Sequence, residues 1–151
     1  MLNRLFGNYL VNRGYLNPAQ LDDLLETITE YKADPQTVIL VNKFLPLSQI
    51  RFIQQSQMQE ESFTEAALRL QLLTDNQIEQ IVQFQSLPVM CFAQLLLDKQ
   101  ILQTEDIMCV LADFQMYYQF TDEQLHVLCI DDMEQIIRIF VPFQNPRMHE
   151  L

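Results

Sequence analysis

The chain has 151 residues, of which 49% are hydrophobic, and its formal net charge is −11 at pH 7. A chain of this length buries enough surface to fold without a metal or a disulfide, as one domain or as two small ones that share an interface. Its apolar runs, such as residues 95–97, fall far short of the roughly 20 residues that a membrane-spanning helix requires. Residues 1–12 alternate polar and apolar side chains, unlike a signal peptide. We therefore expect a cytoplasmic protein without a membrane span.

The negative charge lies almost entirely in the later part of the chain. Residues 1–58 contain five basic and five acidic side chains, whereas residues 59–151 contain four basic and fifteen acidic ones. An acidic surface repels phosphate backbones and the sequence has no basic cluster, so we expect no nucleic-acid binding. The chain contains only two glycines, Gly7 and Gly14, which argues against the glycine-rich loops that hold nucleotide phosphates.

The cysteines give no sign of a metal site or a disulfide framework. Cys91, Cys109 and Cys129 are widely spaced among apolar residues, and the sequence has no Cys-x-x-Cys pair or cluster of Cys and His. We predict that all three are buried and pack as small apolar side chains. No metal and no cofactor is expected.

An internal repeat of about 30 residues organises the chain. Residues 6–21 align without a gap with residues 92–107, and shorter versions of the pattern occur at residues 40–50 and 68–78. Repeats of this length are typical of helical hairpins that bury their apolar faces against one another. The sequence therefore predicts an all-α fold of about four stacked helix-hairpin repeats, with roughly 8–10 short helices.

The first copy contains the signals that begin and end each helix of a hairpin. Residues 6–10 carry apolar side chains at helical spacing, which predicts a short first helix with one buried face. Gly14 stands where a helix commonly ends in a left-handed residue. Asn17 and Gln20 have the spacing of a capping box, and Pro18 suits the first turn of the second helix.

Later copies repeat these signals. Residues 74–77 and 121–124 have capping-box spacing before further apolar helical faces. We therefore assign repeats 1 and 2 to residues 1–58, repeats 3 and 4 to residues 59–120, and a C-terminal extension to residues 121–151. This extension is expected to lead into a further domain.

Residues 136–143 leave two alternatives open. Met133, Ile136, Ile137 and Phe140 have the spacing of an amphipathic helix. The same run is rich in β-branched and aromatic side chains, which favours a strand. We favour the helix.

Residues 6–25, FGNYLVNRGYLNPAQLDDLL, resemble a known repeated motif, LGxxLVxxGxLxxxxLxxxL. Tandem copies of that motif form the N-terminal helical domain of type II secretion and type IV pilus assembly ATPases. The resemblance covers about residues 3–115 and is strongest in the first and fourth copies. It implies a helical domain, which in some members of the family binds cyclic di-GMP. Similar hairpins precede chemotaxis-type signalling domains in bacteria.

No copy in this chain contains the complete ligand-binding version of the motif. That version opens with Arg-Leu-Gly and closes with Gln, whereas the first copy has Leu5 at the arginine position and Ile28 at the closing position. The fold is therefore expected to carry over, and cyclic di-GMP is disfavoured as a ligand. The residues that remain candidates to hold a phosphate group are Arg4, Gly7, Arg13 and Gly14.

No catalytic constellation is apparent in the sequence. His126 and His149 are not part of a recognisable nucleophile motif, and adjacent carboxylates on a helix point apart. An enzyme becomes a candidate only if the fold places His126 in a pocket with a carboxylate. Among the aromatic side chains of residues 114–120, Tyr117 is the candidate for a partner surface, while Phe114 and Tyr118 are predicted to be buried.

The sequence as a whole predicts a non-enzymatic protein-interaction or regulatory module. The resemblance places such a module in a bacterial secretion, pilus or chemotaxis-type signalling system, and its ligand would be a protein partner or a second copy in a homodimer. The alternative is a domain that senses a cyclic dinucleotide through the first repeat.

Overall fold

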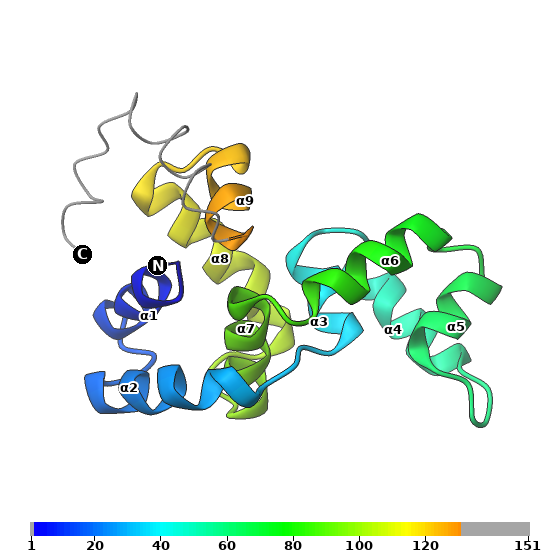
Figure 1. The fold of residues 1–151 in the computed structure, drawn as a ribbon, viewed down its shortest axis with the longest axis horizontal. Coiled ribbons are helices and arrows are strands. Elements are labelled where there is room, and N and C mark those ends of the chain that lie inside the picture. The colour runs from blue at the N-terminus through cyan, green and yellow to red at the C-terminus, as the bar shows by residue number, and fades with distance from the viewer. Residues whose placement is uncertain (1, 131–151) are drawn as a thin grey trace.

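The computed structural model describes residues 2–130, and these residues form an all-helical fold (Figure 1). They contain nine α-helices, one short 3-10 helix and no strand, which confirms the predicted fold class. The alternatives for residues 136–143, His149 and most of the proposed C-terminal extension lie outside the described residues. The helices are α1 (Leu2–Asn12), α2 (Pro18–Thr27), η1 (Ile28–Glu30), α3 (Pro35–Val41), α4 (Leu47–Ser56), α5 (Phe63–Arg69), α6 (Asp75–Phe84), α7 (Pro88–Asp98), α8 (Thr104–Tyr118) and α9 (Asp122–Ile130).

The repeat in the sequence is a repeat of helix-ending geometry. The first helices of the four hairpins, α1, α3, α5 and α7, are each followed by one residue with a left-handed backbone, with φ between 59° and 83°. The next residue donates its N–H to the carbonyl five positions earlier, at 2.9–3.0 Å in each copy. This is the Schellman arrangement, which satisfies carbonyls at the helix end. The left-handed residues are Gly14, Lys43, Gln71 and Gln100.

The helix starts follow the capping signals in the sequence. Asn17 and Thr74 each form a complete capping box with the glutamine three residues later, and Thr121 exchanges the same two hydrogen bonds with Gln124. These contacts satisfy N–H groups that a helix start leaves without a partner. Prolines lie in the first turns of α2, α3 and α7, where a missing N–H costs nothing.

The four hairpins do not pack in a simple line. A linear stack has contacts only between neighbouring copies. Here α3, from the second copy, contacts α5 and α6 of the third copy and α7 and α8 of the fourth, while α7 also packs against α1 and α2 of the first. As a result α3 lies between two groups of helices, with α4, α5 and α6 on one side and α1, α2, α7, α8 and α9 on the other (Figure 1).

An aromatic cluster centred on Phe114 joins the first copy to the fourth. Phe114 of α8 is 1% exposed, and its ring centroid lies 4.9 Å from that of Phe6 and 5.6 Å from that of Tyr9, both in α1. Tyr118 and Phe120 pack on the same ring, at 5.3 and 6.0 Å. The edge-to-face orientation of these pairs is the favourable one for aromatic rings. The predicted burial of Phe114 and Tyr118 is confirmed.

Gly7 permits α1 and α2 to pack closely. It is buried, and a Cβ atom at this position would lie 2.3 Å from Cδ1 of Leu21 in α2. A larger residue at position 7 would therefore push the buried Leu21 side chain out of its place.

The prediction for the cysteines was correct for one thiol and wrong for another. Cys91 is buried in α7, whereas Cys109 is exposed. The buried face of α8 is formed by Ile107, Val110, Phe114 and Tyr118, and Cys109 lies outside that stripe. The side chain of Cys129 is outside the part that the structure describes.

Replacing Gln100 by glycine is expected to stabilise the protein. A side chain in the left-handed region costs about 1–2 kcal/mol, which glycine avoids. We expect Gln100→Gly to raise the free energy of unfolding in urea by about 1 kcal/mol, and Gly14→Ala to lower it by a similar amount. The control is Gln80→Gly, since Gln80 is exposed within α6 and its replacement should cost about 1 kcal/mol. Equal destabilisation by Gln100→Gly and Gln80→Gly would contradict the role of residue 100 as a left-handed helix end.

Candidate functional site

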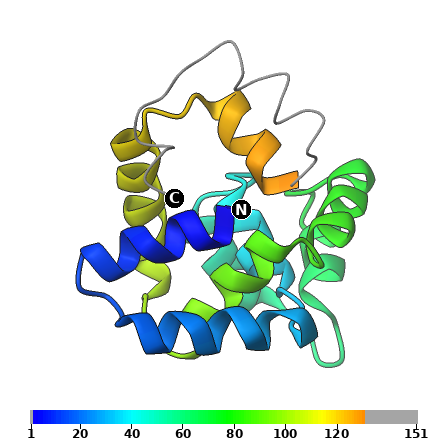
Figure 2. The same cartoon turned by 60° about the vertical axis from the view of Figure 1, so that its left-hand side comes forward.

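A partly open pocket of about 310 Å³ lies between α1, the end of α3, α7, α8 and α9. Figure 2 shows how three of these helices, α1 (blue), α8 (yellow) and α9 (orange), are arranged. The volume is at the lower end of the range of roughly 300–1,000 Å³ that is typical of ligand pockets. Its apolar lining consists of Leu2, Phe6, Val41, Val89, Ala93, Met108, Leu111, Ala112, Phe114 and Leu125.

Five polar side chains complete the lining of the pocket, and some of them are held in place. The Asn42 amide donates a hydrogen bond of 2.8 Å to the carbonyl of Val38. The Gln115 amide donates to the Phe120 carbonyl at 3.1 Å and to the Asp122 carboxylate at 2.8 Å. The remaining two polar lining residues are Lys43 and His126.

His126 and the carboxylate of Asp122 line the same pocket, which meets the condition under which an enzyme becomes a candidate. Their arrangement does not form a catalytic pair. His126 is exposed and makes no hydrogen bond with any residue from 2 to 130, and the Asp122 carboxylate is bound to Gln115. The residues that line the pocket include no serine, threonine or cysteine. Among residues 2–130 the lining therefore contains no hydroxyl or thiol nucleophile and no histidine that a hydrogen bond orients.

The four candidate phosphate-binding residues do not converge on one site. Arg4 and Arg13 are both exposed on α1 or just after it, and their separation of nine residues places them on opposite faces of a helix. The Arg13 guanidinium lies 5.2 Å from the centre of the Tyr9 ring. Gly7 is buried against Leu21 and Gly14 is an exposed helix end, so each glycine has a role in the fold. None of the four lines the pocket.

Tyr117, the candidate for a partner surface, belongs to the aromatic cluster. It is half-buried, and its ring centroid lies 5.7 Å from that of Tyr9 and 4.9 Å from that of Tyr118. Part of its surface is therefore used in packing α8 against α1.

Gln94 was not among the predicted site residues, yet it makes more hydrogen bonds than any other buried polar side chain of residues 2–130. It is 5% exposed, and its Oε1 accepts hydrogen bonds from the N–H of Asp34 at 2.9 Å and the hydroxyl of Thr37 at 2.5 Å. Its Nε2 donates to Asp98 at 2.9 Å. The Tyr31 hydroxyl donates to the same carboxylate at 3.1 Å, and burial together with Asp98 raises the pKa of Tyr31. The sequence does contain one sign of a buried polar contact here, because Gln94 is the single polar residue among the otherwise apolar residues 89–97.

The linker before α3 and the linker before α7 are also bonded to each other. The Ala33 N–H donates to the carbonyl of Gln85, and the Gln85 amide donates to the carbonyl of Ala33, both at 2.9 Å. The thiol of Cys91 donates to the Tyr31 carbonyl at 3.0 Å. Burial raises the pKa of Cys91, so the thiol stays protonated and keeps this bond. These contacts fix the starts of α3 and α7 together.

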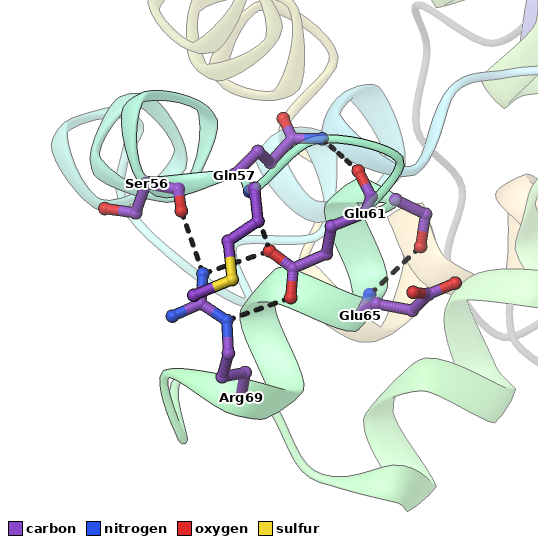
Figure 3. Close-up of polar contacts among 7 residues, drawn as sticks. Ser56, Gln57, Glu61, Glu65 and Arg69 are labelled. Atoms are coloured by element: carbon purple, nitrogen blue, oxygen red, sulfur yellow. Dashed lines mark hydrogen bonds and ion pairs between the residues drawn. The ribbon is translucent and has the colours of Figure 1, made fainter.

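A further polar cluster lies between α4 and α5 (Figure 3). The Arg69 guanidinium donates to both oxygens of Glu61, at 2.9 and 3.0 Å, and to the Ser56 carbonyl at 2.8 Å. Glu61 also accepts a hydrogen bond of 3.0 Å from the N–H of Met58. Arg69 thus ties the end of α4 to Glu61, and Glu61 in turn holds the Met58 N–H, so we interpret the cluster as a clamp on the loop between α4 and α5.

Comparison with protein-family models, with curated proteins and with solved structures finds no match to this chain. Within residues 2–130, no group of three His, Cys, Asp or Glu side chains could hold a metal ion. Within the same residues, no single helix is long and apolar enough to cross a membrane. Helices α6 and α7 reach the required length and hydropathy only when they are taken together, and the chain bends by 81° between them.

The clamp predicts a stability effect that depends on pH. Hydrogen bonds from Arg69 and from the Met58 N–H lower the pKa of Glu61, so its stabilising effect is full above the unfolded pKa and is lost as the pH falls through the folded value. We therefore expect Glu61→Gln to lower the melting temperature at about pH 7, and the loss to become smaller as the pH falls below the unfolded pKa of Glu61. Glu79→Gln, which changes an exposed side chain of α6, is the matched control. A Glu61→Gln effect that does not change with pH would contradict the assignment.

Proposed function

We propose that this chain is a non-enzymatic interaction module that binds an apolar segment of a protein partner in the pocket between α1, α7, α8 and α9. The observation that carries the proposal is the pocket itself, in which ten apolar side chains are accompanied by only five polar ones. Grooves with an apolar floor and a polar edge are typical of sites that receive one face of an amphipathic helix. The lack of a hydrogen-bonded histidine and of a hydroxyl or thiol nucleophile among the described lining residues supports a binding role.

Charge favours a basic partner. Residues 59–130 contain eleven acidic and two basic side chains. Three of the acidic ones, Asp113, Asp122 and Glu123, are exposed on α8 and α9, which form one side of the pocket. Opposite charge around an apolar contact accelerates association and selects the partner. A second copy of the chain carries the same negative charge, so it suits the pocket less well than a segment with lysine or arginine beside its apolar residues.

The biological setting rests on the resemblance of residues 6–25 to the repeats of secretion and pilus assembly ATPases. We propose a role in a bacterial secretion, pilus or chemotaxis-type signalling system, in the cytoplasm. The alternative, a sensor of cyclic di-GMP that uses the first repeat, has less geometric support. It would need Arg4 and Arg13 to reach one ligand from different faces of α1.

Filling the pocket is expected to weaken the binding of an amphipathic basic helix. The probe is a fluorescent peptide of leucine and lysine with helical spacing, and fluorescence anisotropy gives its affinity. Ala112 lines the pocket and is exposed, so a tryptophan at this position occupies the binding volume without entering the core. We expect Ala112→Trp to weaken binding at least tenfold, which corresponds to about 1.4 kcal/mol.

The matched control is Ala19→Trp, because Ala19 is exposed on α2 and does not line the pocket. A peptide in which glutamate replaces lysine should not bind either protein. Equal binding of the lysine peptide by both tryptophan variants would show that the pocket is not the site. Binding of cyclic di-GMP that is lost in Arg4→Ala would instead favour the nucleotide-sensing alternative.

A further inference from the structure

A second cavity, of about 340 Å³, lies beside the Gln94 network. Residues of α3, α4 and α7 and the first residue of α8 line it, and Asp34 adds the residue before α3. The first pocket is apolar, whereas this cleft has three glutamine amides and two threonine hydroxyls in its lining. It also contains charged groups of both signs, contributed by Asp34, Arg51 and Asp98.

Two carboxylates in the lining of the cleft have no cationic partner among residues 2–130. The Asp34 side chain is exposed and makes no hydrogen bond or ion pair with any residue from 2 to 130. Within the same residues, Asp98 accepts hydrogen bonds only from neutral donors, the amide of Gln94 and the hydroxyl of Tyr31. Gln94 binds the Asp34 backbone and the Asp98 carboxylate at once, so the two acidic residues are neighbours in the lining of the cavity.

Arg51 of α4 supplies the positive charge in the cleft. Its guanidinium is paired with Glu105 of α8, and the two side chains are 50% and 57% exposed. An ion pair this exposed contributes little, because water screens it. A carboxylate that enters the cleft can therefore replace Glu105 on the guanidinium, which presents two parallel donors to such a group.

We propose that this cleft binds a free amino acid with a polar side chain. The ammonium group of the ligand binds Asp34 and Asp98, and its carboxylate binds Arg51. A simple anion would meet two unpaired carboxylates and a simple cation would meet Arg51, so a small molecule with both charges matches the lining best. The amides and hydroxyls of the walls provide hydrogen bonds for a side chain such as a carboxamide. The volume suits a molecule of this size.

Isothermal titration calorimetry of the whole chain with L-glutamine tests the proposal. Acetate and methylamine, which each carry one of the two charges, are expected not to bind. Arg51→Gln and Asp34→Asn should each weaken the binding of L-glutamine about three- to fivefold, because each removes a contact to a solvent-exposed charged group. Glu105→Gln should strengthen it, because it frees the Arg51 guanidinium. Arg13→Gln, on an exposed side chain outside the cleft, should leave the affinity unchanged.

Three results would overturn the proposal. The first is no measurable binding of L-glutamine up to about 10 mM. The second is binding of methylamine or acetate as tight as that of L-glutamine, which would mean that only one charge is recognised. The third is an affinity that Glu105→Gln leaves unchanged, and this variant decides the matter even if Arg51→Gln fails to fold by circular dichroism.

Discussion

Gln94 holds the start of α3 against α7 from a position that is only 5% exposed. Its side chain satisfies the N–H of Asp34 and the hydroxyl of Thr37, and it is itself satisfied by Asp98. Buried polar groups are costly unless they are bonded, so this set of contacts fixes one relative position of the two helices. The bonds between Ala33 and Gln85 fix the same junction from the linkers.

Both cavities depend on this junction. The apolar pocket takes Val41 from the end of α3 and Ala93 from α7, and the polar cleft takes Thr37 from α3 and Gln94 from α7. Because α3 belongs to the second copy and α7 to the fourth, neither cavity exists within a single hairpin. The repeats provide similar building blocks, and the contact between the second and fourth copies turns them into two different sites. The apolar one supports the proposed partner site, and the polar one supports the proposed amino-acid site.

The sequence predicted the local structure well because the signals for it are local. Asn17 and Thr74 each cap a helix through a hydrogen bond to a residue three positions later. Gly14 ends the first helix with a left-handed backbone, which glycine adopts readily. The sequence did not predict how the hairpins pack, since Gln94 and Asp34 lie 60 residues apart and a glutamine among twenty gives no indication of its partner. The pocket could not be predicted for a related reason. The apolar residues that line it have the same helical spacing in the sequence as the apolar residues that form the core.

Amide hydrogen exchange of the Gln94→Met variant tests this account most directly. Methionine has nearly the shape of glutamine and cannot form its hydrogen bonds, so the Asp34 N–H and the Thr37 hydroxyl lose their partner. We expect the protection of the Asp34 amide to be lost and the free energy of unfolding to fall by about 2–4 kcal/mol. Gln83→Met, at an exposed position of α6, should change neither. A Gln94→Met protein with a protected Asp34 amide and unchanged stability would contradict the central role of this junction.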